Sequence, residues 1–129
     1  MGTDSGYSYS TASLNDRRTQ LNVSNTVLSS PPQFQQLFND VVAQSGHTVR
    51  LIARVSGSPA PHVWWSYNGE TIDPINPGRN REISQTGDRH ILTLNNIRAS
   101  ETGRYSITAE NQTGVAACSA IVYVDDGNR

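Results

Sequence analysis

The strongest constraint on the fold is a pair of alternating runs near the end of the chain, separated by a turn. The first run follows Glu101 and the second spans Val115 to Val124, with a turn predicted at Asn111 to Gly114. Apolar residues at every second position have the period of a strand with one buried face; in the first run they are Tyr105, Ile107 and Ala109. The sequence therefore predicts an antiparallel hairpin that supplies part of a β-sheet core.

The rest of the chain repeats this pattern of short strands and turns. His47 to Gly57 alternates cleanly, Asn68-Gly69 is a strong signal for a tight turn, and Arg81–Thr86 and Arg89–Leu94 are predicted as two short strands joined at Gly87-Asp88. Turns about every ten residues, without helix-period apolar patterns, predict an all-β sandwich. The expected structural core is Trp65, Tyr105, Ala53, Ile107, Leu51, Leu92, Leu94 and Cys118.

Composition limits the classes of function. The 129 residues suit one domain plus a tail, and the formal net charge of -1, with arginine but no lysine, gives no electrostatic driving force toward nucleic acid or an anionic membrane. No apolar run approaches the roughly 18 residues of a membrane span. The single cysteine, Cys118, excludes an intrachain disulfide, and this favours a reducing compartment.

Composition also divides the chain. Residues 1–30 are rich in Ser, Thr and Asn and predict a flexible linker or tail. A few apolar residues at its end are candidates for packing on the domain: Leu21, Val23, Val27 and Leu28. Pro31 and Pro32 suit the head of an edge strand, because neither can donate a backbone hydrogen bond. We expect a domain at 31–125 and a C-terminal tail at 126–129.

No group of residues has the spacing of a catalytic, cofactor-binding or metal site. The three histidines fall in different predicted segments without the spacing of metal ligands, and all are expected at the surface: His47, His62 and His90. No strand–elbow–helix context supports a serine nucleophile. Asn22 and Asn111 match the N-glycosylation pattern, but Asn111 occupies a predicted turn, where we expect it to serve turn geometry.

Several short motifs occur in a characteristic order. They are Pro31-Pro32-x-Phe34, Ser45-Gly46, Val55-Ser-Gly-Ser-Pro59, Trp65 with Asn68-Gly69, Leu92-x-Leu94, Glu101-x-Gly103-x-Tyr105 and Ala109-Glu-Asn111 with Gly114. In this order the chain resembles an I-set immunoglobulin domain of the intracellular muscle and cytoskeletal type, as in titin, twitchin, obscurin, palladin and myotilin. The resemblance implies an immunoglobulin-like β-sandwich of two antiparallel sheets with Greek-key connections, in which Tyr105 is the tyrosine corner.

The chain departs from that family at the disulfide. The family's two cysteines fall on Ala53 and Ile107, so the sandwich is expected to have no intradomain disulfide. A disulfide closing so long a loop contributes about 2–5 kcal/mol, and packing around Trp65 must offset its absence. Glu101 stands where the family usually has Asp. Loss of both cysteines is what the resemblance leads one to expect of intracellular members.

The resemblance implies a non-catalytic structural or protein-interaction module of an intracellular muscle or actin-cytoskeleton scaffold, in the cytoplasm and the sarcomere. Its expected partners are neighbouring immunoglobulin modules and other cytoskeletal proteins, with self-association as a further candidate. Binding to nucleic acid, a membrane, a metal or a cofactor is not expected. Two alternatives stay open: an extracellular adhesion or receptor module, and a direct F-actin-binding domain as in palladin-like proteins. A parent protein with a kinase domain elsewhere is compatible with each.

One outer surface is the candidate site for protein binding. Trp65 takes the inward position, so its neighbour Trp64 is expected on the outer face of the sheet, where exposed tryptophan beside aliphatic residues is typical of binding hot spots. The residues expected on this face are Trp64, Thr108, Val115, Ala117, Ile121 and Tyr123. The competing interpretation is that the linker, or Arg104 through a cation–π contact, covers Trp64.

Overall fold

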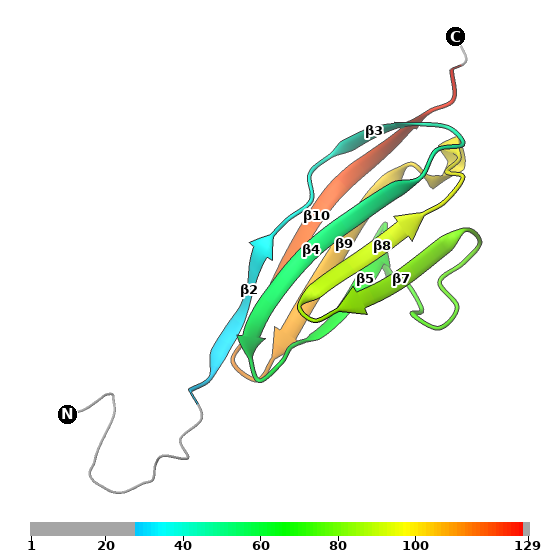
Figure 1. Ribbon diagram of the computed structural model, residues 1–129. Helices are drawn as coiled ribbons and strands as arrows, with labels where there is room; N and C mark the ends of the chain where they lie inside the picture. The colour runs from blue at the N-terminus through cyan, green and yellow to red at the C-terminus, as the bar shows by residue number, and fades with distance from the viewer. Residues whose placement is uncertain (1–27, 128–129) are drawn as a thin grey trace, which may run out of the picture.

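The computed structural model describes residues 28–127, which form a sandwich of short strands (Figure 1). The strands are β2 (Ser30–Gln36), β3 (Val41–Gln44), β4 (Val49–Ser58), β5 (His62–Tyr67), β6 (Glu70–Thr71), β7 (Arg81–Thr86), β8 (Arg89–Leu94), β9 (Gly103–Asn111) and β10 (Gly114–Asp125), with a 3-10 turn, η2 (Ala99–Glu101), before β9. No helix within these residues is long and apolar enough to cross a membrane.

The strands form two sheets that face each other. One has the order β3-β10-β9-β5-β6 and the other the order β2-β4-β8-β7. The pairs are antiparallel except for β3 and β10, which run parallel with Val122 opposite Val41. This exception arises because the chain passes from β2 to β3, and so from one sheet to the other, through the short segment between Gln36 and Val41. The sequence prediction of an all-β two-sheet sandwich is confirmed.

Turn chemistry closes the hairpins where the sequence indicated. Asn68 and Gly69 connect β5 to β6 with φ values of 49° and 88°, and a two-residue hairpin turn with two positive φ angles favours Asn-Gly. Gly103 has a different role: a Cβ there would lie 2.6 Å from the side-chain oxygen of Asn68. That oxygen accepts the backbone N–H of Arg104 at 2.9 Å, so Gly103 allows the β5–β6 turn to dock on β9.

The core lies between the sheets and is centred on Trp65. Trp65 is 2% exposed, and its ring stacks on Phe38 with ring centroids 5.6 Å apart. The other expected core residues that the structure places there are fully buried, namely Leu51, Ala53, Leu92, Leu94, Tyr105 and Ile107. Cys118 packs against this cluster but is only half-buried, with its Sγ 3.8 Å from the carbonyl oxygen of Phe38. Burial raises the pKa of its thiol.

Ala53 and Ile107 lie on opposite sheets, in β4 and β9, and both are 0% exposed. They belong to the same apolar cluster as Trp65. The position expected for a covalent tie between the sheets is therefore filled by one small and one large aliphatic side chain. Since the chain has a single cysteine, no intrachain disulfide joins the two sheets, and packing in the core takes its place.

Tyr105 fixes the turn that leads into β9. Its hydroxyl donates to the carbonyl of Glu101 at 2.6 Å, four residues upstream, which is the geometry of a tyrosine corner. Burial raises the pKa of Tyr105 to about 12. Glu101 accepts the backbone N–H of Arg98 at 3.0 Å, so its longer side chain caps the η2 turn.

The described residues cover only part of the predicted division into linker, domain and tail. Among the described residues the first strand begins at Ser30 and the last ends at Asp125, and β2 is an edge strand, as its two prolines require. The predicted linker falls almost wholly on residues 1–27, which lie outside the described residues, as do 128–129. The division into linker, domain and tail stays a prediction.

Replacing Ile107 by Ala tests whether packing alone joins the sheets. We expect Ile107→Ala to lower the free energy of unfolding by about 2–5 kcal/mol, because it opens a cavity at a fully buried site. The matched control is Ile121→Ala, which removes the same atoms from the outer face of the neighbouring strand, at a side chain that is 37% exposed. Urea unfolding followed by fluorescence measures both, and equal losses would contradict this account of the core.

Candidate interaction surface

The outer face of the β5–β9–β10 sheet brings three of the six expected surface residues into one row. Trp64 lies opposite Thr108, and Thr108 lies opposite Ala117. Directly cross-strand residues share a face and lie about 5 Å apart. Because Trp65, Ile107 and Cys118 form the adjacent inward row, this row faces outward.

A second row flanks Trp64 and is partly charged. His62 lies opposite Glu110, which lies opposite Val115. Val115 is 62% exposed, while Trp64 is half-buried. The rings of His62 and Trp64 are 5.2 Å apart between centroids and tilted by 34°. Trp64 is thus supported on one side by His62, with Val115 two strands away.

The other two expected residues, Ile121 and Tyr123, belong to a separate region. A row of serines, Ser66 opposite Ser106 opposite Ser119, lies between them and Trp64, and the hydroxyls of Ser106 and Ser119 are 2.7 Å apart. Tyr123 instead lies beside Val42 on β3; they are 53% and 74% exposed. The predicted surface is therefore two apolar regions divided by hydroxyl groups.

Val42 was missed by the sequence prediction, although a signal was present. Val41 packs against the core and Val42 alternates with it, so the outward direction of Val42 follows from the period of the strand. What the sequence lacked was the parallel pairing of β3 with β10, which places Val42 next to Tyr123.

The proposed cation–π cover of Trp64 by Arg104 is not seen among the described residues. The cation–π contact present there joins Arg81 to Tyr67, with the guanidinium carbon 5.0 Å from the ring centroid. The backbone of Arg104 makes two hydrogen bonds with Asn68. Its N–H donates to the side-chain oxygen of Asn68, and its carbonyl accepts the backbone N–H of Asn68 at 2.8 Å. The alternative cover, the linker, falls outside the described residues except for residues 28–30, of which Leu28 is 84% exposed.

A groove runs along the free edge of β5 beside Trp64. Its volume is about 380 Å³ and its lining residues come from β5, β6, β7 and β9 and from the loop between β6 and β7. The lining residues are His62, Val63, Trp64, Trp65, Thr71, Ile72, Pro74, Ile83 and Glu110. Most of them are apolar, which is the usual chemistry of a site that takes an aliphatic side chain.

Asn111 joins three segments at the end of the sandwich where β2 begins. Its Nδ2 donates to the carbonyls of Ser30 at 2.7 Å and Pro59 at 3.0 Å. Its Oδ1 accepts the backbone N–H and the hydroxyl of Thr113, both at 2.9 Å. A primary amide has two N–H donors and two acceptor lone pairs, so all are used. A sugar on Nδ2 would remove one of these donors; the turn role expected for Asn111 matches the geometry.

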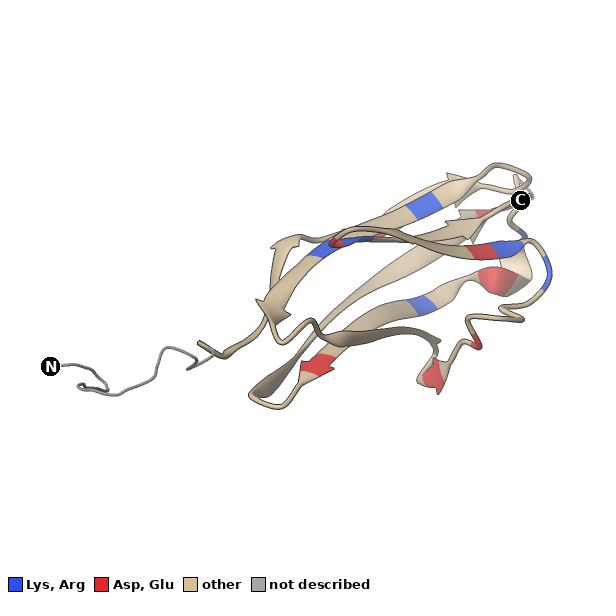
Figure 2. Cartoon of the chain, turned by 60° about the horizontal axis from the view of Figure 1, so that its bottom comes forward, with Lys and Arg blue, Asp and Glu red and all other residues tan. Residues whose placement is uncertain are grey.

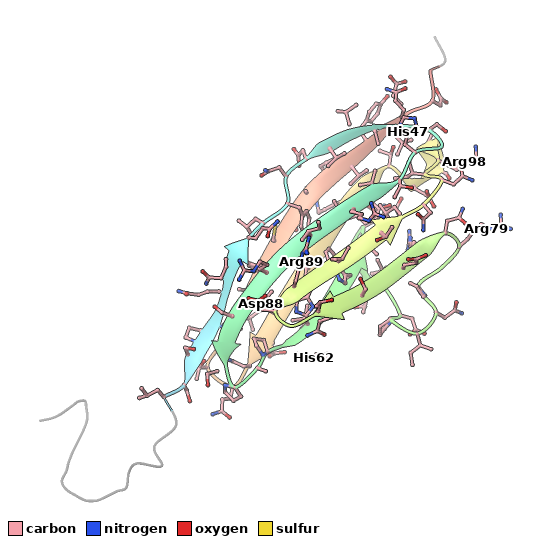
Figure 3. All side chains as sticks on the ribbon, viewed as in Figure 1. His47, His62, Arg79, Asp88, Arg89 and Arg98 are labelled. Atoms are coloured by element: carbon pink, nitrogen blue, oxygen red, sulfur yellow. The ribbon has the colours of Figure 1, made fainter. Side chains whose placement is uncertain are left out.

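The histidines are far apart, and one of them is not at the surface. Figure 3 shows His47 and His62 at opposite ends of the domain. The expectation that all three are exposed is wrong for His90, which is 8% exposed because it shares the inward parity of Leu92 and Leu94 on β8. Within residues 28–127 no group of three potential metal ligands occurs.

His90 lines a second cavity, of about 340 Å³, with Gln85 and Asp88. Burial lowers the pKa of His90, and the nearby carboxylate of Asp88 opposes this effect. Asp88 is paired with Arg54 on β4, with Nη2 and Oδ2 3.2 Å apart, and this hydrogen bond lowers the pKa of Asp88. Figure 2 shows the charged residues spread over strands and loops of both sheets.

The two facing sheets, the tyrosine corner and the buried tryptophan define an immunoglobulin-like β-sandwich. Residues 32–124 match the model of the immunoglobulin I-set domain, and the chain belongs to that family. Solved structures of similar fold include titin domains z1z2 in complex with telethonin (TM-score 0.73, 31% identity, covering 78% of this chain and 50% of that one). The titin M10–obscurin-like 1 Ig complex is another (TM-score 0.71, 28% identity, covering 78% and 99%).

Three relatives show the range of proteins that contain such a domain. Human myotilin is 34% identical over 67% of this chain, and zebrafish (Danio rerio) striated muscle preferentially expressed protein kinase is 32% identical over 72%. Neural cell adhesion molecule L1 of Rattus norvegicus is 35% identical over 61%. The chain spans only 17%, 3% and 6% of these three proteins, respectively.

The Asn111 bonds can be tested by removing its two donors. We expect Asn111→Asp to lower the free energy of unfolding by about 2–3 kcal/mol, because a carboxylate has no proton to give the carbonyls of Ser30 and Pro59 and repels them. Gln112→Glu is the matched control, since it makes the same amide-to-carboxylate change at the neighbouring exposed position. Thermal unfolding monitored by circular dichroism compares them; similar stability of the two variants would refute the role given to Asn111.

Burial of His90 predicts that the domain loses stability in mild acid. The folded state keeps His90 neutral below the ordinary pKa of 6.5, whereas the unfolded chain takes up a proton near that pH. The free energy of unfolding that depends on neutral His90 is therefore fully present above pH 6.5 and is lost as the pH falls toward the lowered pKa of the folded state. Urea unfolding between pH 7 and about pH 5 should show a shallower loss for His90→Leu than for the exposed control His47→Leu. If the free energy of unfolding falls equally steeply with pH in the two variants, the burial of His90 does not cause the loss of stability in acid.

Proposed function

We propose that this chain is a non-catalytic structural and protein-interaction module of an intracellular muscle or actin-cytoskeleton scaffold protein. Membership of the I-set family supports the module, and relatives such as myotilin support the muscle setting. Titin domains, which resemble this chain in fold, have been solved in complexes with telethonin and with an obscurin-like 1 immunoglobulin domain. By analogy, the partners of this chain are other proteins, including immunoglobulin modules.

The observation that carries the binding role is the half-buried Trp64 on the outer face, beside the groove at the β5 edge. Its row carries no charge, since Trp64 lies opposite Thr108 and Thr108 opposite Ala117. An aromatic side chain of this size, flanked by aliphatic and polar residues, is a typical centre of a protein-binding hot spot. The Tyr123–Val42 region is a second, smaller candidate surface.

The observation that supports an intracellular setting is the filling of the inter-sheet core by Ala53 and Ile107. Extracellular domains of this size are commonly held by disulfides, and this one relies on packing. Because neural cell adhesion molecule L1 is among the relatives, an extracellular adhesion module is the alternative. Intact-mass measurement of the protein from its native source separates the two, because the adhesion alternative predicts added glycans and the cytoplasmic one predicts none.

Direct binding to F-actin is the remaining alternative. Actin binding by such domains is expected to use a basic surface, and the ten basic residues of this chain are arginines balanced by eleven acidic ones. The arginines of the described part are spread over strands and loops (Figure 2). Co-sedimentation with F-actin over a series of salt concentrations tests this alternative, and retention at low salt with release at high salt would favour it.

The role of Trp64 is tested by a binding measurement paired with a stability measurement. We expect Trp64→Ala to weaken self-association, or binding to telethonin or an immunoglobulin module of titin, by roughly tenfold or more, because it removes the largest side chain of this row. The free energy of unfolding should change by less than about 1 kcal/mol, since the side chain is on the outer face. Sedimentation velocity, calorimetric titration and urea unfolding give these values.

The control variant is Ile75→Ala, which removes apolar atoms from a side chain that is 92% exposed on the loop between β6 and β7. It should leave both binding and stability unchanged. Equal losses of stability and binding in Trp64→Ala would mean that Trp64 is a structural residue. Unchanged binding in a measurable complex would move the site away from this face.

A further inference from the structure

The edge of β5 that faces away from β9 has no partner strand beside Val63, one of the residues that line the groove. Asn68 donates its backbone N–H to the carbonyl of Arg104 on β9, and Ile72 donates its N–H to the carbonyl of Trp65 at 2.8 Å on the opposite side. Successive residues of a strand direct their N–H and C=O groups to opposite edges. The odd-numbered residues of β5 therefore face away from β9, and Val63 directs both backbone groups to that edge.

No described strand covers Val63 there. β6 pairs only with Ser66 and Tyr67, and after Ile72 the chain leaves the edge in the loop that leads to β7. An uncovered edge with free backbone groups is a template for one more strand. The groove beside it is apolar, with Ile72 and Ile83 among its walls, and so offers a place for an aliphatic side chain of that strand.

The chain itself reaches the described domain at the end of the sandwich where β5 begins, beside the end of β9. One nitrogen, Nδ2 of Asn111, holds the carbonyls of both Ser30 and Pro59 within 3.0 Å. Pro59 precedes the first residue of β5 by three residues, a separation of at most about 11 Å. Ser30 therefore lies near the start of β5, and Leu28, two residues upstream, is 84% exposed.

The segment before Leu28 has the composition of such a strand. At the odd positions of 21–27 three of the four residues are aliphatic, Leu21, Val23 and Val27, and the even positions are Asn22, Ser24 and Thr26. The segment carries no charge and is rich in β-branched residues. The seven residues span about 23 Å when extended, enough for the four residues from His62 to Trp65.

We infer that residues 21–27 of this same chain add a strand to the free edge of β5 and place an aliphatic side chain in the groove beside Trp64. The strand runs antiparallel to β5, because it approaches Ser30 at the end of the sandwich where β5 begins. It satisfies the N–H and C=O of Val63 and covers one side of Trp64. This segment then competes with any partner that binds the groove. The inference stands on the edge and the groove and does not depend on the proposed function.

The test compares two neighbouring amides of β5 in the full chain. The N–H of Trp64 points to β9 and is protected from hydrogen exchange in either case, whereas the N–H of Val63 is protected only if the edge is covered. We expect slow exchange at Val63, measured by NMR, together with nuclear Overhauser contacts between Val63 and residues 21–27. Fast exchange at Val63 beside a protected Trp64 would overturn the inference.

Substitutions identify the occupant. The triple variant Leu21→Asp, Val23→Asp and Val27→Asp should raise the exchange rate of Val63 by roughly tenfold or more and leave Trp64 unchanged. Leu14→Asp, a change of the same kind outside the segment, should alter neither. Unchanged protection of Val63 in the triple variant overturns the inference. So does protection that is lost on dilution, because it assigns the edge to a second copy. If the triple variant is globally destabilised, the contacts of the unaltered chain decide.

Discussion

The packing between β4 and β9 around Trp65 is the interaction on which the rest of the structure depends. Ala53 and Ile107 meet there without a covalent bond, and the stacked rings of Trp65 and Phe38 extend the same apolar cluster toward β3. An aromatic side chain of this size buries roughly 200 Å², and its contribution replaces part of what a disulfide supplies by restricting the unfolded chain. The two contributions differ in kind. Packing is lost when a single side chain shrinks, so the domain is sensitive to substitution where a bridged sandwich is tolerant.

That buried row also fixes the outer surface. Because side chains alternate along each strand, inward Trp65 requires outward Trp64, and inward Ile107 requires outward Thr108. The core and the candidate interaction surface are thus two sides of the same three strands. A change of register in β5 by one residue would exchange the two tryptophans and lose both at once. The Asn68-Gly69 turn, docked on β9 through Gly103, holds β5 in its register.

The sequence predicted the strands and their faces well, because these depend on local alternation and turn chemistry. It could not predict features that depend on pairing between distant segments. The parallel pairing of β3 with β10, the resulting Tyr123–Val42 region and the serine row that divides the surface all require knowledge of which strands are neighbours. His90 is instructive because its parity with Leu92 and Leu94 was visible, yet its polarity was given more weight than its position. The resemblance to the family supplied the topology that periodicity alone could not.

Asn111 links the end of the sandwich to the candidate binding groove. As part of a sequence pattern it suggested a glycan; in the structure its amide ties the start of β2, the loop before β5 and the turn between β9 and β10 into one unit. This places the point where the described chain enters the domain at the end of the sandwich where β5 begins. A binding surface beside the entry point is accessible to the chain's own preceding residues at a high effective concentration, so those residues compete there before any partner arrives. The residue that secures the end of the fold therefore also determines which segment can reach the groove.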